Sequence, residues 1–160
     1  MEVSDICRAS TIGNESPEFF LKKLSQQGFS IDNTIEDLIE EQFIRANEGI
    51  SQLSISKITV GEIGTFENRY PIHREVFEKL DVKYFIDNTT VLSVVSQTPI
   101  ADLNAGINIF EHCPIITSKG FFTIAVEKIK DNKGNYKFFL KAIKASYMCF
   151  LSDSVFIVNT

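Results

Sequence analysis

The side chains best suited to chemistry are concentrated between residues 69 and 75 of this 160-residue chain. His73 could act there as a general base, and Arg69 could hold an anionic group. Cys113 offers a nucleophile elsewhere, directly after Glu111 and His112. Cysteine and histidine that act together are normally brought together by the fold rather than by adjacency. The catalytic arrangement to test is therefore Cys113 with His73.

Packing explains the same residues without catalysis. A lone histidine beside an apolar helical stripe is usually a packing residue, and Arg74 has Glu78 four positions on as an ion-pair partner. The sequence contains no GxSxG or HExxH motif, no phosphate-binding glycine loop and no zinc-type cysteine spacing. We therefore expect no metal and no cofactor. An enzyme or small-molecule site around Arg69, His73 and Cys113 is kept as an alternative.

A basic segment distinguishes the last quarter of the chain. Residues 119–144 contain seven lysines and two acids, a local charge of +5 in a protein of formal net charge −5. Aromatic residues lie between these lysines, as in surfaces that stack bases while ammonium groups hold phosphates. The candidate polyanion-binding residues are Lys128, Lys130, Lys133, Lys137, Lys141 and Lys144.

Three observations favour a structural role for this basic segment. Its basic residues are all lysine, whereas arginine is the usual choice for bidentate phosphate contacts. The sequence pI is about 5.1, far from the basic footprint of a nucleic-acid-binding domain. Lysines also protect exposed sheet edges against aggregation. Binding of nucleic acid or another polyanion by a hairpin over 119–144 is thus an alternative function.

Acidic residues dominate the first half instead. Residues 1–81 contain 15 acids and 8 bases. A predicted helix that begins after Thr34 carries the candidate partner-binding residues Glu36, Asp37, Glu40 and Glu41 on its polar face. Such segregation of charge steers association between proteins. We therefore predict a soluble, non-catalytic interaction or regulatory domain that binds another protein, with its oligomeric state left open.

Targeting signals and cysteine usage indicate the compartment. The N-terminus has neither the basic nor the apolar region of a signal peptide. The longest uncharged run, residues 88–101, has 14 residues and is too short for a membrane helix. Cys7, Cys113 and Cys149 are odd in number and far apart, which is typical of free thiols in a reducing compartment. We expect a cytoplasmic protein without membrane association. Its lysine, isoleucine and asparagine usage is bacterial or phage-like.

Hydrophobic periodicity and turn residues predict the elements that must position these side chains. Helices are expected at 16–28, from 34 to 49, from 71 to 80 and from 98 to 113, with a turn at 61–64. Strands are expected at 50–60, 82–86, 90–95, 121–130, 136–150 and 155–158. The segment 131–135 provides the best turn in the sequence, between two β-rich runs.

These elements predict an α+β fold in a single domain, residues 1–160. Residues 1–49 form a helical hairpin, and residues 50–160 form an antiparallel sheet of about five to six strands with helices packed on it. The C-terminal β-hairpin is expected to be its most regular part. Because residues 155–158 form an apolar strand, the alternative is that the chain is the N-terminal domain of a longer protein.

Overall fold

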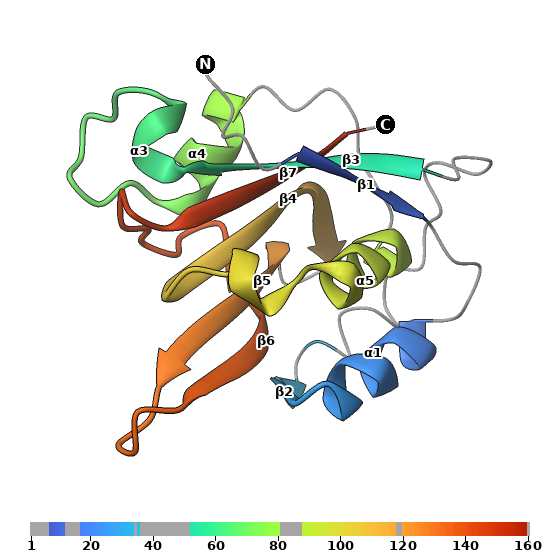
Figure 1. The fold of residues 1–160 in the computed structure, drawn as a ribbon. Coiled ribbons are helices and arrows are strands. Elements are labelled where there is room, and N and C mark those ends of the chain that lie inside the picture. Colours follow the sequence, from blue (N-terminus) through green and yellow to red (C-terminus); the bar gives the residue numbers. More distant parts are fainter. Residues whose placement is uncertain are drawn as a thin grey trace.

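The computed structural model describes residues 7–11, 17–33, 35, 52–80, 88–117 and 120–159. Their fold is α+β, as the sequence predicts, with helices packed on a sheet (Figure 1). The described strands are β1 (Cys7–Thr11), β2 (Phe29–Ile31), β3 (Gln52–Thr59), β4 (Gly106–Thr117), β5 (Gly120–Lys130), β6 (Tyr136–Lys144) and β7 (Ser154–Asn159). The described helices are α1 (Pro17–Gln26), α3 (Val60–Ile63), α4 (His73–Leu80), α5 (Asn88–Gln97) and the 3₁₀ turn η1 (Ile100–Asp102).

The seven described strands form one sheet in the order β1-β3-β7-β4-β5-β6-β2. It is mixed rather than fully antiparallel, because β7 runs parallel to β4 and β2 runs parallel to β6. The remaining neighbours are antiparallel, and β5 with β6 forms the longest regular hairpin, as predicted. The strand expected at 155–158 is β7, and it lies inside the sheet, between β3 and β4.

Two apolar cores lie on opposite faces of the sheet. One packs α1 and α5 against the sheet and includes Leu24, Leu92 and Phe156. The other lies under α3 and α4 and includes Val76 and Ile157. Because β7 is buried on both faces, its sequence is a continuous apolar run rather than an alternating one.

The first predicted helix is confirmed. The α1 helix begins at Pro17, and Gly28 two residues beyond its end has a φ of 99°, the left-handed conformation that glycine adopts most easily. The second predicted helix, residues 34–49, and the strand predicted at 82–86 lie outside the described residues, apart from Ile35.

The strand predicted at 90–95 is wrong, because this segment is helix α5. Its β-branched residues favour a strand locally, but residues 92–96 are all buried between α1 and the sheet. The polar side chains are accommodated by bonds to carbonyls of the same helix: Ser96 Oγ donates to Ser93 O at 2.7 Å, and Thr98 Oγ1 donates to Val94 O at 2.9 Å. Tertiary burial therefore outweighs local propensity here.

The helix predicted over 98–113 is also wrong. A 3₁₀ turn, η1, is followed by the long strand β4. The helical spacing of Leu103, Ile107 and Phe110 misleads because β4 is buried on both faces, where periodicity cannot separate helix from strand. Ile107 packs in the core under α4, whereas Phe110 stacks on Phe156 in the core under α1 and α5, with ring centroids 4.8 Å apart.

Two smaller differences concern the connections. The predicted turn at 61–64 is the helical turn α3, where the carboxylate of Glu62 accepts hydrogen bonds from Thr59 N and Oγ1. Strand β6 ends at Lys144 rather than continuing to residue 150.

The hairpin turn at 131–135 is confirmed: Asp131 Oδ1 accepts from the backbone N–H groups of Lys133 and Asn135, at 2.8 and 2.9 Å.

Candidate functional site

A buried histidine–glutamate pair joins helix α4 to strand β4. His73 Nε2 lies 2.5 Å from Glu111 Oε1, and both side chains are 0% exposed. His73 is the first residue of α4, and its backbone N–H donates to the carbonyl of Tyr147 at 2.7 Å. Glu111 lies opposite Ile157 of β7, within an irregularity of the β4–β5 ladder that spans residues 109–114. The Glu111 side chain lies on the same face of the sheet as Ile157, in the core under α4.

The environment of this pair is that of a structural contact. Glu111 Oε2 and Thr123 Oγ1 are buried and have no hydrogen-bond partner among the described residues. A buried polar group is costly unless it is paired, so the contact with His73 offsets part of that cost. The pair has no surface in contact with solvent, which gives a substrate no access to either side chain. We interpret it as the contact that fixes α4 on the sheet.

Of the residues proposed from the sequence as a small-molecule site, the structure describes the side chains of His73, which is buried, and Arg69. Arg69 is exposed, and its guanidinium lies 5.5 Å from the ring centroid of Tyr70. The side chain of Cys113 lies outside the described part of the chain. Sequence reasoning missed Glu111 as the partner of His73 because it assigned residues 98–113 to a helix. Alternation along a strand would have placed Glu111 on the same face as Ile107.

The described thiol is not poised for reaction. Burial raises the pKa of Cys149 to about 12, and the nearby carboxylates of Asp153 and Glu111 add to this rise. Because the thiolate is the nucleophilic form, a raised pKa makes Cys149 inert at neutral pH. Burial also raises the pKa of Tyr147 to about 12. Among the described side chains no group of three or more histidine, cysteine, aspartate or glutamate residues could hold a metal ion.

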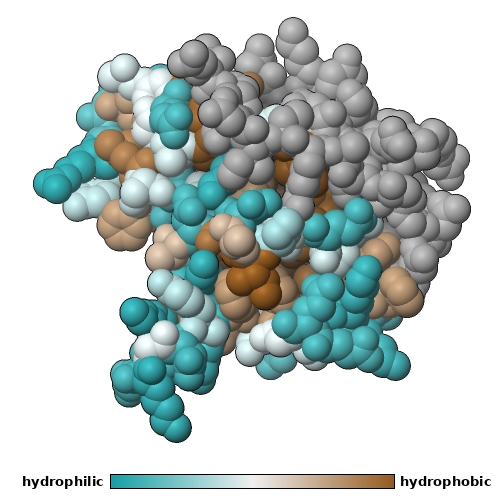
Figure 2. Space-filling view, viewed as in Figure 1, coloured by the Kyte–Doolittle hydropathy of each residue, from teal (hydrophilic) through white to brown (hydrophobic). Residues whose placement is uncertain are grey.

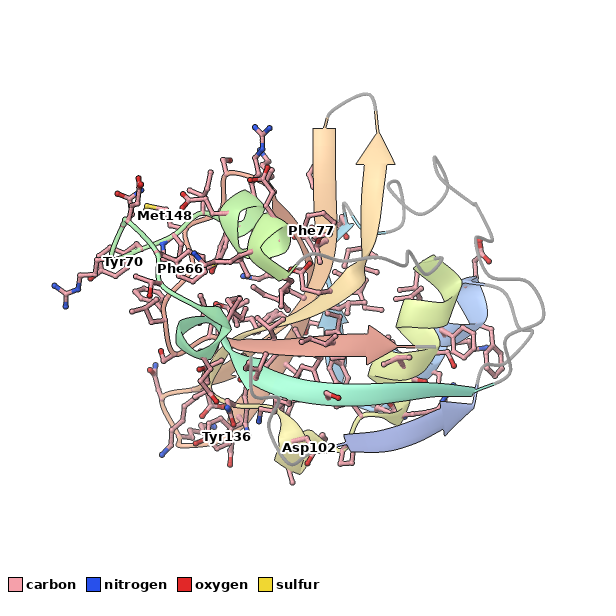
Figure 3. The ribbon with its side chains drawn as sticks, turned by 90° about the horizontal axis from the view of Figure 1, so that it is seen from above. Phe66, Tyr70, Phe77, Asp102, Tyr136 and Met148 are labelled. Carbon is pink, nitrogen blue, oxygen red and sulfur yellow. The ribbon has the colours of Figure 1, made fainter. Side chains whose placement is uncertain are left out.

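Four large apolar side chains are exposed on two segments that the backbone brings together. We call them the aromatic cluster: Tyr70 (44% exposed), Met148 (65%), Phe150 (55%) and Leu151 (45%). The rings of Tyr70 and Phe150 meet edge to face, with centroids 5.5 Å apart. Figure 3 shows Tyr70 and Met148 projecting beyond α4 and away from the sheet. The cluster therefore presents apolar surface that is about half exposed to solvent.

Backbone hydrogen bonds brace the two segments that carry the cluster. Residues 69–74 and 145–151 are joined by bonds from Cys149 N to Pro71 O, at 2.8 Å, and from Arg74 N to Ala145 O, at 2.9 Å. A β-bridge links Ile72 to Met148. The exposure of these side chains is thus fixed by the main chain rather than by their own packing. Sequence reasoning missed the cluster because it assigned residues 136–150 to one strand.

The carboxylate of Asp153 holds the second of these segments in place. It is 4% exposed and accepts hydrogen bonds from the backbone N–H groups of Phe150, at 2.9 Å, and of Ile107. Burial raises the pKa of Asp153, and the two N–H donors oppose the rise. Asp153 therefore connects the cluster to the start of β4.

The six candidate lysines are distributed over both faces of the β5–β6 hairpin. Strand register places Lys128, Lys130 and Lys144 on the face of the α1–α5 core, and Lys137 and Lys141 on the other. Lys133 lies in the turn, and Lys119 lies outside the described residues. The end of the hairpin projects from the body as a hydrophilic arm at the lower left (Figures 1 and 2). The lysines consequently form two smaller groups rather than one continuous face.

Two of these lysines are engaged within the protein. Lys141 forms an ion pair with Glu127 across the hairpin. Lys128 Nζ donates to Leu103 O at 2.9 Å and lies 4.5 Å from the ring centroid of Tyr136. These contacts join the two strands of the hairpin to each other and to Leu103, which supports a structural role for Lys128 and Lys141.

A related polar network secures the segment between α5 and β4. Lys57 is 9% exposed and donates to Asp102 O at 2.7 Å and to Asn104 Oδ1 at 3.0 Å. Asn108 Nδ2 donates to Asn104 O at 3.0 Å and to Val126 O at 3.1 Å. Burial lowers the pKa of Lys57, and the charge of Asp102 opposes that change. Because Lys57 bonds two acceptors of this segment, we assign it a structural role.

The acidic residues proposed as a partner-binding surface, Glu36, Asp37, Glu40 and Glu41, lie outside the described residues. They remain a prediction from the sequence. No helix in the described ranges is long and apolar enough to cross a membrane.

Comparisons with protein-family models, with curated proteins and with solved structures found no match to this chain.

Proposed function

We propose that this chain is a non-catalytic interaction domain that binds another protein through the aromatic cluster. The observation that carries the proposal is the exposure of Tyr70, Met148, Phe150 and Leu151 on two braced segments. Tyrosine, phenylalanine, methionine and arginine are enriched at protein interfaces. A fixed, rigid apolar surface also loses little conformational freedom on binding, which favours affinity. Burial of His73 and Glu111 supports a non-catalytic role.

Charge at the margin of the cluster indicates the chemistry of the partner. The guanidinium of Arg69 lies over the ring of Tyr70 and is exposed beside it. An acidic group opposite Arg69 would complement this charge and fix the orientation of the complex. The expected partner is therefore a protein with an apolar cleft that has a carboxylate at its edge. The acidic residues 36–41 are a proposed second surface, for a basic part of a partner.

Photo-cross-linking in the native cell tests this proposal. A benzophenone amino acid is placed at position 70, in the cluster, or at position 19, where Phe19 of α1 is equally exposed at 47%. We expect one defined partner from position 70 that position 19 does not give. If both positions give the same products, the cluster is not the contact surface. A cross-link to a second copy of this chain would contradict the proposed partner class.

Affinity for the purified partner then measures the contribution of the cluster. Interface hot spots cost at least about 2 kcal/mol when truncated, or roughly 30-fold in Kd. We expect such a loss for Tyr70→Ser combined with Phe150→Ser, and less than about twofold for the control Phe19→Ser. Thermal unfolding of each variant separates lost contact from lost folding.

A further inference from the structure

We propose that the end of the β5–β6 hairpin binds single-stranded nucleic acid, with Tyr136 as a stacking platform and Lys130, Lys133 and Lys137 as phosphate contacts. This surface is separate from the aromatic cluster, and Figure 3 shows Tyr136 well away from Tyr70 and Met148. Binding of nucleic acid at this surface does not depend on the protein partner proposed for the aromatic cluster.

The stacking platform is a half-exposed ring with two ammonium groups near it. Tyr136 is 49% exposed, and Lys128 and Lys130 lie 4.5 and 5.9 Å from its ring centroid. Lys130 is the direct cross-strand neighbour of Tyr136, and Lys128 is that of Phe138. Lys128 is also held by the carbonyl of Leu103, which fixes its position beside the ring. A base stacks on such a ring whatever its sequence, because every base has a π-face.

The proposed phosphate contacts are exposed lysines of the hairpin that form no ion pair among the described residues. They are Lys130, Lys133 and Lys137. The one acid of the turn, Asp131, has its Oδ1 occupied by the N–H groups of Lys133 and Asn135. The end of the hairpin is therefore a positively charged projection, with Tyr136 and Lys130 on one face and Lys137 on the other.

The exposed ring favours a nucleic acid over an acidic peptide. Lysines alone would attract either polymer, because both carry repeated negative charge. A single strand offers unstacked bases next to its phosphates, which matches a ring next to ammonium groups. A duplex keeps its bases stacked, so it would engage the lysines without the ring. The predicted order of affinity is single strand first, then duplex, then an acidic polypeptide of equal charge.

Fluorescence anisotropy with a labelled oligonucleotide of about 15 thymidines tests this order. We expect binding at about 20 mM salt that weakens steeply towards about 200 mM. Tyr136→Leu should weaken binding about 10-fold at either salt concentration, since stacking is lost and charge is unchanged. Lys130→Gln should lower the slope of log K against log salt by about 0.7, the contribution of one phosphate contact.

Lys22→Gln is the matched control, because Lys22 is exposed on α1 and its substitution changes the net charge equally. If Lys22→Gln and Lys130→Gln weaken binding equally, the effect is one of net charge and the proposal is wrong. Absence of binding at low salt would also overturn it. The proposal would also be wrong if polyglutamate displaced the labelled oligonucleotide as well as an unlabelled single strand does. That result would indicate that the lysines bind an acidic protein. Circular dichroism of both hairpin variants verifies that they are folded.

Discussion

The aromatic cluster and the end of the β5–β6 hairpin both expose aromatic rings, but the neighbours of those rings differ. In the cluster the ring of Tyr70 meets that of Phe150 and has a single cation, Arg69, beside it. In the hairpin the ring of Tyr136 has two cations near it, Lys128 and Lys130. The first setting favours a mainly apolar contact with one charge at its margin and a weak dependence on salt, whereas the second favours an anion and a steep dependence on salt. Exposed aromatic content therefore says little about the partner until the charges beside each ring are known.

The two regions also differ in what holds them in place. Backbone bonds to Pro71 and Ala145 brace the cluster, and the buried pair of His73 and Glu111 fixes the helix beneath it. The hairpin depends on its own turn and on contacts along its two strands. A perturbation of the core should therefore reach the cluster and spare the end of the hairpin, and the reverse should hold for a perturbation of the turn.

The largest effect should come from His73→Ala. The substitution leaves the buried carboxylate of Glu111 without this partner, which should lower the free energy of unfolding by about 2 to 5 kcal/mol. The exposed pair of Arg74 and Glu78 is the control, and Arg74→Ala should cost no more than about 0.5 kcal/mol. Urea denaturation measures both. A loss below about 1 kcal/mol for His73→Ala would show that the pair is not what fixes α4.

A smaller effect is expected from Gly134→Ala in the turn of the hairpin. Gly134 has a φ of 83°, and a side chain in the left-handed region costs about 1 kcal/mol. Hydrogen exchange should show faster opening of the end of the hairpin, with unchanged protection of residues 145–151. Asn132→Ala, in the same turn, is the control. Equal loss of protection in both regions would mean that the hairpin and the cluster open as one unit.

The smallest effect concerns Asp153, in the cluster region, and is a change in how the free energy of unfolding depends on pH. Burial raises its pKa, so the folded protein binds a proton more readily than the unfolded chain does. This contribution is most favourable below the ordinary pKa of aspartate, about 3.9, and is lost as the pH rises through the folded value. The stability of the wild type relative to Asp153→Asn should therefore fall as the pH rises from about 4. Denaturation of both proteins across this range measures it, and a constant or rising difference would contradict it.

Local patterns predicted the elements whose signals come from turns and caps. Pro17 and Gly28 mark α1, and the turn at 131–135 is held by the side chain of Asp131, as its residue types indicate. The faces of the β5–β6 hairpin also follow from alternation. These elements could be predicted because their determinants are neighbours in sequence.

Elements buried on both faces could not be predicted in the same way. Helix α5 is rich in threonine and valine, and its burial between α1 and the sheet overrides their strand preference. Strand β4 shows helix-like spacing because both of its faces are apolar.

The contact of His73 with Glu111 joins residues 38 positions apart, so no local pattern reveals it. The aromatic cluster depends on the same long-range pairing, between residues 69–74 and 145–151.

The central position of β7 has a consequence for the order in which the chain folds. Residues 154–159 pair with β3 on one side and with β4 on the other, so β3 has no direct route to β4 without them. While the chain is being synthesised, the β4–β5–β6 unit can form from neighbouring segments. Strand β3 cannot join that unit until β7 has been made, and its apolar face stays uncovered until then. Such non-local closure slows folding and extends the time during which strands are open to aggregation. A chaperone that shields the first half of the chain would act in this interval.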